Sequence, residues 1–172
     1  MSRISVLSAE QTPEGSRPLL ESVQSAYGMV PNVFKVLAHS PAGLATYLQF
    51  HQANENTSLT AQQREIISLA VSQVNKCSYC TAVHSLIGSK VGLSKEELLS
   101  ARNGTLDAYA TFAREVSLAR GHINDEVLST ARAEGLSDAV IIEVISQVTL
   151  LVFTNLLNNV AHTSLDFPPV DM

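Results

Sequence analysis

The sequence predicts an all-α fold, a helical bundle in a single domain over residues 1–172. Helix-capping residues recur along the chain, and each is followed by apolar residues at helical spacing. No stretch alternates between apolar and polar residues for long enough to indicate a β-strand. Because 45% of the residues are hydrophobic and only 16% are charged, the chain has enough apolar surface to form a packed core.

The first helices are marked by capping residues and by prolines near their starts. A short helix opens at Ser16 and closes at Gly28, because glycine readily adopts the left-handed conformation of a C-cap. A second helix begins at Pro31-Asn32, and a third runs from Ser40-Pro41 to about Asn56.

A capping box at residues 60–63 opens a helix that is apolar nearly all round, so we expect this helix at the centre of the bundle. The next helix should begin at the two cysteines and end near Gly92, and Ser94 with Glu97 caps a short one. The remaining predicted helices run from Leu106 to Arg120, from Asp125 to Glu134 and from Asp138 to about His162. Residues 167–172 are predicted to form an extended tail.

The charge balance excludes nucleic acid as an expected partner. Eleven Lys and Arg stand against 16 Asp and Glu, giving a net charge of −5, and no basic cluster is present to follow a phosphate backbone. The first residues lack the apolar run of a signal peptide, so we expect a cytoplasmic protein with reduced thiols. The loop between Cys77 and Cys80 is too short for a disulfide to stabilise the fold usefully, which favours redox chemistry or metal binding for this pair.

Residues 139–157 are apolar over about the length that crosses a bilayer. This stretch contains Glu143, Gln147 and Asn155, and no Lys or Arg follows it to anchor a membrane span. We therefore interpret it as a buried bundle helix or a subunit-interface helix, and expect no membrane partner.

The candidate chemistry lies between Glu65 and His84. If a helix starts at Cys77, then Cys80 and His84 point to the same side of it as Cys77. Cys80 and His84 are then close enough for an imidazole to exchange a proton with a thiol, and the two cysteines are close enough to form a disulfide. A thiol in the first turn of a helix also has a lowered pKa, because unpaired N–H groups stabilise the thiolate.

Glu65 lies among apolar residues in the preceding helix, where a carboxyl group tends to have a raised pKa suited to proton transfer. It reaches Cys80 and His84 only if the two helices turn back on each other. The alternative is a surface carboxylate, or one that is paired with a neighbouring arginine.

Four residues at fixed intervals carry a resemblance to a known family: Glu65, Cys77, Cys80 and His84. Within residues 64–67 and 75–84, this pattern resembles the alkylhydroperoxidase D-like branch of the carboxymuconolactone decarboxylase superfamily. Residues 28–41 and the corner at 135–137 are also similar to peroxidase-related members. The resemblance implies an all-helical fold with a core at about 41–121 and a long helix at about 138–162, assembled as a dimer, trimer or hexamer.

The resemblance also implies site roles. Cys80 would be the peroxidatic thiol, Cys77 the resolving thiol, and Glu65 with His84 the proton relay that activates Cys80. The substrate would be an organic hydroperoxide or hydrogen peroxide, an external dithiol would reduce the resulting disulfide, and no bound cofactor or metal is expected. The sequence departs from the family at Tyr79, where the peroxidases can place a further histidine.

Three alternatives remain open from the residues. Cys77, Cys80 and His84 could supply ligands to zinc, with Glu65 or water as the fourth. The chain could be a non-redox enzyme like the lactone decarboxylases of the superfamily, or a helical interaction module with inert core cysteines. The other histidines, His39, His51, His122 and His162, are interpreted as structural or exposed, and Tyr27, Tyr47 and Tyr109 as core or rim aromatic residues.

Overall fold

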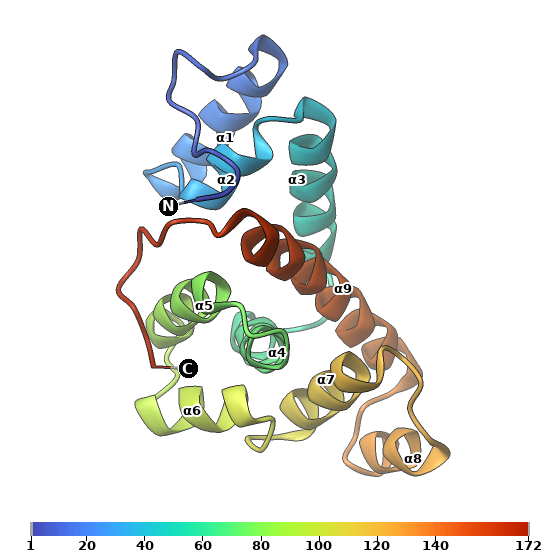
Figure 1. Ribbon diagram of the computed structural model, residues 1–172. Helices are drawn as coiled ribbons and strands as arrows, with labels where there is room; N and C mark the ends of the chain where they lie inside the picture. Colours follow the sequence, from blue (N-terminus) through green and yellow to red (C-terminus); the bar gives the residue numbers. More distant parts are fainter. Residues whose placement is uncertain (1, 172) are drawn as a thin grey trace.

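The computed structural model describes residues 2–171, and within that range it contains helices and no β-strand. The all-α prediction is therefore confirmed. A 3-10 turn, η1 (Glu14–Ser16), precedes the α-helices (Figure 1), which are α1 (Arg17–Tyr27), α2 (Asn32–Leu37), α3 (Pro41–Glu55), α4 (Ala61–Val74), α5 (Ser78–Lys90), α6 (Lys95–Asn103), α7 (Ala108–Ala119), α8 (Asp125–Ala133) and α9 (Asp138–Ala161).

Helix α4 is the centre of the bundle, as its apolar circumference predicts. It packs against α5, α6, α7 and α9, which surround it in Figure 1. Ile67, Ala70 and Val71 of α4 are fully buried and share one core cluster with Phe112 of α7 and Val144 of α9. Burying apolar surface on several sides of one helix is the main stabilising contribution expected in such a bundle.

The N-terminal helices form a second packed group at one end of the molecule (Figure 1). Val23 of α1, Phe34 and Leu37 of α2, and Leu44 of α3 are buried together, and Leu157 of α9 packs against them. The far half of α9 thus joins the N-terminal helices to the central bundle.

The helix starts follow the capping residues closely. The capping boxes Thr60 with Gln63 and Ser94 with Glu97 are both formed, and the Ser40 hydroxyl accepts a hydrogen bond from the Gly43 N–H. One boundary was predicted too early, because α7 begins at Ala108 rather than at Leu106. The Asp107 carboxylate accepts a hydrogen bond from the Ala110 N–H and so acts as the N-cap.

Helix α9 has a mixed inner face and an apolar outer one. Gln147 and Asn155 donate side-chain hydrogen bonds to Ser68 and Ser72 of α4. By length and composition α9 could cross a membrane, and 44% of its most apolar window is buried inside the fold. The interpretation as a bundle helix is confirmed by its packing on α4, and its outer side chains remain exposed.

The chain after α9 has no regular secondary structure, as predicted, and it runs past α2 and α5 towards α6 (Figure 1). Asp166 accepts a hydrogen bond from the Asn32 N–H, and the Phe167 ring packs edge-on against Tyr79. Further along, the Arg102 guanidinium donates a hydrogen bond to the Asp171 carbonyl. The sequence gives no sign of these contacts, and the last residue of the predicted tail lies outside the described residues.

Candidate functional site

The two cysteines stand at the N-terminus of α5. Cys77 is the N-cap residue, and its sulfur accepts a hydrogen bond of 3.2 Å from the Cys80 N–H. The two sulfurs form a disulfide, with Cα atoms 5.3 Å apart. The expectation that a helical i,i+3 pair can close into a disulfide is therefore confirmed.

Glu65 and His84 form a direct pair between α4 and α5. Glu65 Oε2 lies 2.8 Å from His84 Nδ1, and both side chains are largely buried, 13% and 18% exposed. The two helices do turn back on each other, as the carboxylate role requires. Glu65 is not paired with the neighbouring arginine, because the Arg64 guanidinium donates a hydrogen bond to the Leu59 carbonyl instead.

The close approach of α5 to its neighbours depends on Gly88. A Cβ atom built at this glycine would lie 2.7 Å from a Leu98 methyl group and 3.8 Å from Glu65 Cβ. A side chain here would displace the Leu98 methyl group, whereas the distance to Glu65 Cβ is an ordinary van der Waals contact. Gly88 thus allows α5 and α6 to pack closely beside the pair.

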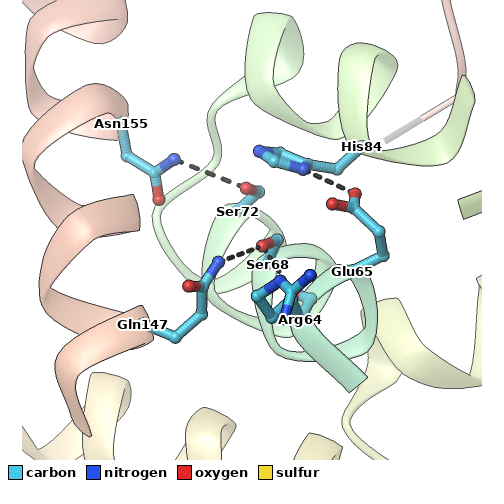
Figure 2. A network of polar contacts seen from close by, with 7 residues as sticks. All are labelled: Arg64, Glu65, Ser68, Ser72, His84, Gln147 and Asn155. Atoms are coloured by element: carbon cyan, nitrogen blue, oxygen red, sulfur yellow. Dashed lines mark hydrogen bonds and ion pairs between the residues drawn. The ribbon is translucent and has the colours of Figure 1, made fainter. Parts of the chain in front are cut away.

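The pair also fixes the state of the imidazole. A carboxylate can only accept, so Nδ1 carries the proton that is shared with Glu65. The other ring nitrogen, Nε2, points away from Glu65 (Figure 2), and in the neutral ring it is a proton acceptor. This arrangement is suited to proton exchange at Nε2.

A cavity of about 360 Å³ opens beside this pair. Glu65, His84 and Cys80 all line it, whereas Cys77 is fully buried and does not. Most of the remaining lining is apolar, including the side chains of Tyr27, Phe34, Tyr47, Leu86, Ile87, Leu150 and Phe167. The structure therefore brings three of the four predicted site residues to one cavity and places the fourth in a bond to one of them.

His51 of α3 lines the same cavity and was missed as a site residue. Its Nδ1 lies 4.0 Å from the Glu55 carboxylate, and burial lowers the pKa of the imidazole below its usual value. The sequence leads to an interpretation of His51 as structural or exposed, and the structure adds that it is a half-buried residue of the cavity wall. The sequence could not indicate this position, because the packing of the N-terminal helices brings α3 to the cavity.

Tyr79, between the cysteines, faces the C-terminal segment. Its hydroxyl donates a 2.8 Å hydrogen bond to Asp166 and accepts one of 3.2 Å from the Val33 N–H. Burial raises the pKa of Tyr79 well above its ordinary value. Both hydrogen bonds of the hydroxyl thus go to α2 and to the C-terminal segment, and Tyr79 does not replace the histidine of the family pattern.

A row of polar side chains from α9 reaches across to the site. Gln147 and Asn155 extend towards Ser68 and Ser72 (Figure 2), and one turn beyond Asn155, Asn158 Nδ2 lies 3.3 Å from Cys80 Sγ. Within residues 2–171, the side-chain carbonyl oxygens of Gln147 and Asn158 are buried without a hydrogen-bond partner. Contacts from a helix so far along the chain leave no spacing signal in the sequence.

The zinc alternative concerned Cys77, Cys80 and His84, and in this structure the two sulfurs are joined in a disulfide. In the part of the chain that the structure describes, no three His, Cys, Asp or Glu side chains are grouped closely enough to hold a metal ion. Among the other histidines, His39 Nε2 lies 2.9 Å from the Ser5 carbonyl, and His122 and His162 are exposed.

The sequence profile of the Carboxymuconolactone decarboxylase family matches residues 41–122. This segment spans α3 to α7 and includes both cysteines, Glu65 and His84. No curated protein matches the sequence significantly.

Solved structures with the same fold include two peroxidase-related proteins and a debrominase. The alkylhydroperoxidase AhpD core protein from Ralstonia eutropha JMP134, an uncharacterized peroxidase-related protein, has 24% identity and a TM-score of 0.83, covering 96% of this chain and 92% of its own. A peroxidase-related protein from Silicibacter sp. TM1040 has 19% identity and a TM-score of 0.77, with 98% and 90% covered. The debrominase Bmp8, solved with 2,3,4-tribromopyrrole, has 15% identity and a TM-score of 0.79, with 96% and 92% covered. These likenesses establish the fold.

Proposed function

Since the chain belongs to the carboxymuconolactone decarboxylase superfamily, with an alkylhydroperoxidase D-like fold, we propose that it is a thiol-dependent hydroperoxidase. The observation that carries the proposal is the arrangement around one cavity. Cys80 opens to the cavity, Cys77 is bonded to it from a buried position, and the Glu65–His84 pair lines the same space.

The first step needs a thiolate at Cys80. Helix N–H groups at the start of α5 favour that charge, and His84, one turn further along, can take the thiol proton at Nε2. The sulfur attacks the terminal oxygen of a hydroperoxide. An S–O bond forms, the O–O bond breaks, and Cys80 becomes a sulfenic acid while the peroxide is reduced to an alcohol. The leaving alkoxide receives its proton from His84.

The second step consumes the sulfenic acid. The Cys77 thiol attacks Cys80 Sγ, the disulfide forms, and water leaves with the thiol proton. The disulfide of the structure corresponds to this oxidised end state. An external dithiol then reduces it by thiol–disulfide exchange and is itself oxidised to a disulfide, so the cycle uses no metal or bound cofactor.

Glu65 serves the cycle through His84. Its carboxylate holds the Nδ1 proton, keeps Nε2 directed away, and stabilises the imidazolium that forms when Nε2 is protonated. This is the proton relay that the resemblance to the family implies. The pair is mostly buried, so its electrostatic interaction is weakly screened.

The cavity lining supports an apolar organic hydroperoxide as substrate, with hydrogen peroxide as a smaller alternative. Aromatic side chains on the cavity wall would also accept a flat halogenated ring, and a debrominase has this fold. We place the reaction in the cytoplasm, where dithiol reductants are available, and in a homo-oligomer formed through the exposed side of α9.

The test is a count of free thiols in reduced protein after one addition of cumene hydroperoxide, hydrogen peroxide or tribromopyrrole. We expect two thiols to become none with the organic hydroperoxide, and dithiothreitol to restore both. Treatment with a metal chelator should leave this result unchanged. If the count stays at two with every peroxide, the hydroperoxidase proposal is wrong, and loss of thiols with tribromopyrrole alone would assign a dehalogenase instead.

A further inference from the structure

Asn158 lies at the reacting sulfur but outside the segment that matches the family profile. Its amide nitrogen is 3.3 Å from Cys80 Sγ, and the side chain lines the cavity while being 95% buried, with 5% of its surface exposed. An amide N–H aimed at a sulfur from a buried position is suited to stabilising a thiolate, because a charged acceptor strengthens the hydrogen bond. Without such a donor, a thiolate in this apolar cavity would be poorly solvated.

The other atom of the same amide is equally informative. Asn158 Oδ1 is buried and has no partner among the described residues. Buried polar atoms in folded proteins are nearly always hydrogen-bonded, so an unpaired acceptor beside a reactive sulfur indicates a site for a ligand donor. A hydroperoxide carries such a donor on its terminal oxygen, the atom that the sulfur attacks.

We propose that Asn158 is a catalytic residue of this site: its N–H stabilises the Cys80 thiolate, and its carbonyl accepts a hydrogen bond from the terminal O–H of the bound hydroperoxide. This inference rests on the proposed function and deepens it. One amide group then aligns the nucleophile and the oxygen it attacks. The bonds that form and break are those of the first step above, and Asn158 itself neither gains nor loses a proton.

Helix α9 is built to hold this amide in place. The cavity side of α9 carries Gln147, Leu151, Thr154 and Asn158 at intervals of three and four residues, which is one face of a helix. The backbone carbonyl of Asn158 accepts hydrogen bonds from the His162 and Thr163 N–H groups at the end of the helix. The backbone of Asn158 is thus fixed independently of its side chain.

The N–H role is tested in a Cys77→Ser background, where Cys80 is the only thiol. The measurement is the rate of alkylation by iodoacetamide as a function of pH. We expect Asn158→Ala to move the profile to higher pH and to slow alkylation at pH 7 by about tenfold. Asn158→Leu, which keeps the branched shape and the number of heavy atoms of the side chain, should do the same. Asn103→Ala, at an exposed amide on α6, should leave the profile in place. Unchanged profiles in both Asn158 variants of native helical content would overturn this role.

The carbonyl role is tested by trapping the sulfenic acid formed with cumene hydroperoxide in the same proteins. At a pH where Cys80 is fully ionised, the Asn158 variants and the Cys77→Ser background protein contain the same fraction of thiolate. We expect the limiting rate of the Asn158 variants to remain about tenfold below that of the background protein, because the peroxide is no longer aligned. A restored limiting rate would overturn the carbonyl role.

The two proposals fail in different ways. If the background protein forms no sulfenic acid with any hydroperoxide, the proposed function fails and the carbonyl role fails with it. The alkylation profile still decides the N–H role in that case, since iodoacetamide needs only the thiolate.

Discussion

The Tyr79 hydroxyl donates a 2.8 Å hydrogen bond to Asp166, and this contact ties the helix of the two cysteines to the C-terminal segment. The same carboxylate accepts a hydrogen bond from the Asn32 N–H at the start of α2. One acidic side chain thus joins three segments that are far apart in the sequence, directly beside the cavity that Tyr79 and Phe167 help to line.

Replacing Tyr79 with Phe should lower the free energy of unfolding by about 1–3 kcal/mol, because a carboxylate loses a hydrogen-bond donor and the Val33 N–H loses its acceptor. Urea denaturation measures the change. Tyr27→Phe provides the control, since Tyr27 is half exposed and its hydroxyl should matter less. Equal stability in the two variants would show that the tail contact contributes little.

Replacing Cys80 with Ser should reduce hydroperoxide turnover to the uncatalysed rate, because the attacking sulfur is gone. Replacing Cys77 with Ser should instead leave one round of reaction intact and a sulfenic acid that dimedone traps, since the resolving thiol is missing. Mass spectrometry of the dimedone adduct locates the modified residue. An adduct on Cys77 in the Cys80→Ser protein would reverse the assignment of the two sulfurs.

Glu65→Gln should slow turnover by about a hundredfold, the scale of a lost proton relay, while leaving substrate affinity nearly unchanged. The amide cannot stabilise the imidazolium of His84 as a carboxylate does, so the pH profile should change shape as well as height. Steady-state kinetics across pH measure both effects. Glu96→Gln, an exposed carboxylate on α6, is the matched control.

The helices could be predicted from the sequence because their signals are local. Thr60 caps its helix through Gln63, three residues away, and Cys77 starts α5 through a contact to Cys80. The disulfide and the shared face of Cys80 and His84 follow from the same local geometry. The pairing of Glu65 with His84 needed one further condition, that α4 and α5 fold back on each other.

The remaining site residues could not be predicted, because tertiary packing places them. Asn158 reaches Cys80 from another helix, Asp166 reaches Tyr79 from the tail, and His51 meets the cavity from α3. No spacing rule connects positions that are separated by tens of residues. A lone asparagine in an apolar helix carries no sign of the sulfur that it will contact.

The stability of the protein should fall as the pH drops below about 6.5, in part through His51. Burial lowers the pKa of His51 from its value of 6.5 in the unfolded chain. The folded state therefore favours the neutral ring, and the stability from this group is present above pH 6.5 and is lost as the pH falls through the folded pKa. Urea denaturation between pH 4 and 8 should show a shallower loss for His51→Gln. His122→Gln, at an exposed position, should follow the unmodified protein.

The outer face of α9 should mediate self-association. Five exposed apolar side chains lie on it within an arc of about 80° at 100° per residue: Ile142, Ile145, Phe153, Leu156 and Val160. An apolar stripe along a whole helix is rarely left in water, and the inner face of α9 is already occupied by α4. A second copy of the chain presents an equal stripe, so an isologous contact can cover both.

Leu156→Glu should therefore shift the protein towards the monomer, because Leu156 is 60% exposed and a carboxylate in the covered stripe would be desolvated without a partner. Analytical ultracentrifugation measures the mass of each variant. Leu99→Glu is the matched control, since Leu99 is 55% exposed on α6, away from the stripe, and should leave the mass unchanged. A monomeric unmodified protein, or an oligomer that survives Leu156→Glu, would contradict the predicted interface. Flotation of the unmodified protein with lipid vesicles would show that a membrane, rather than a second copy, covers this face.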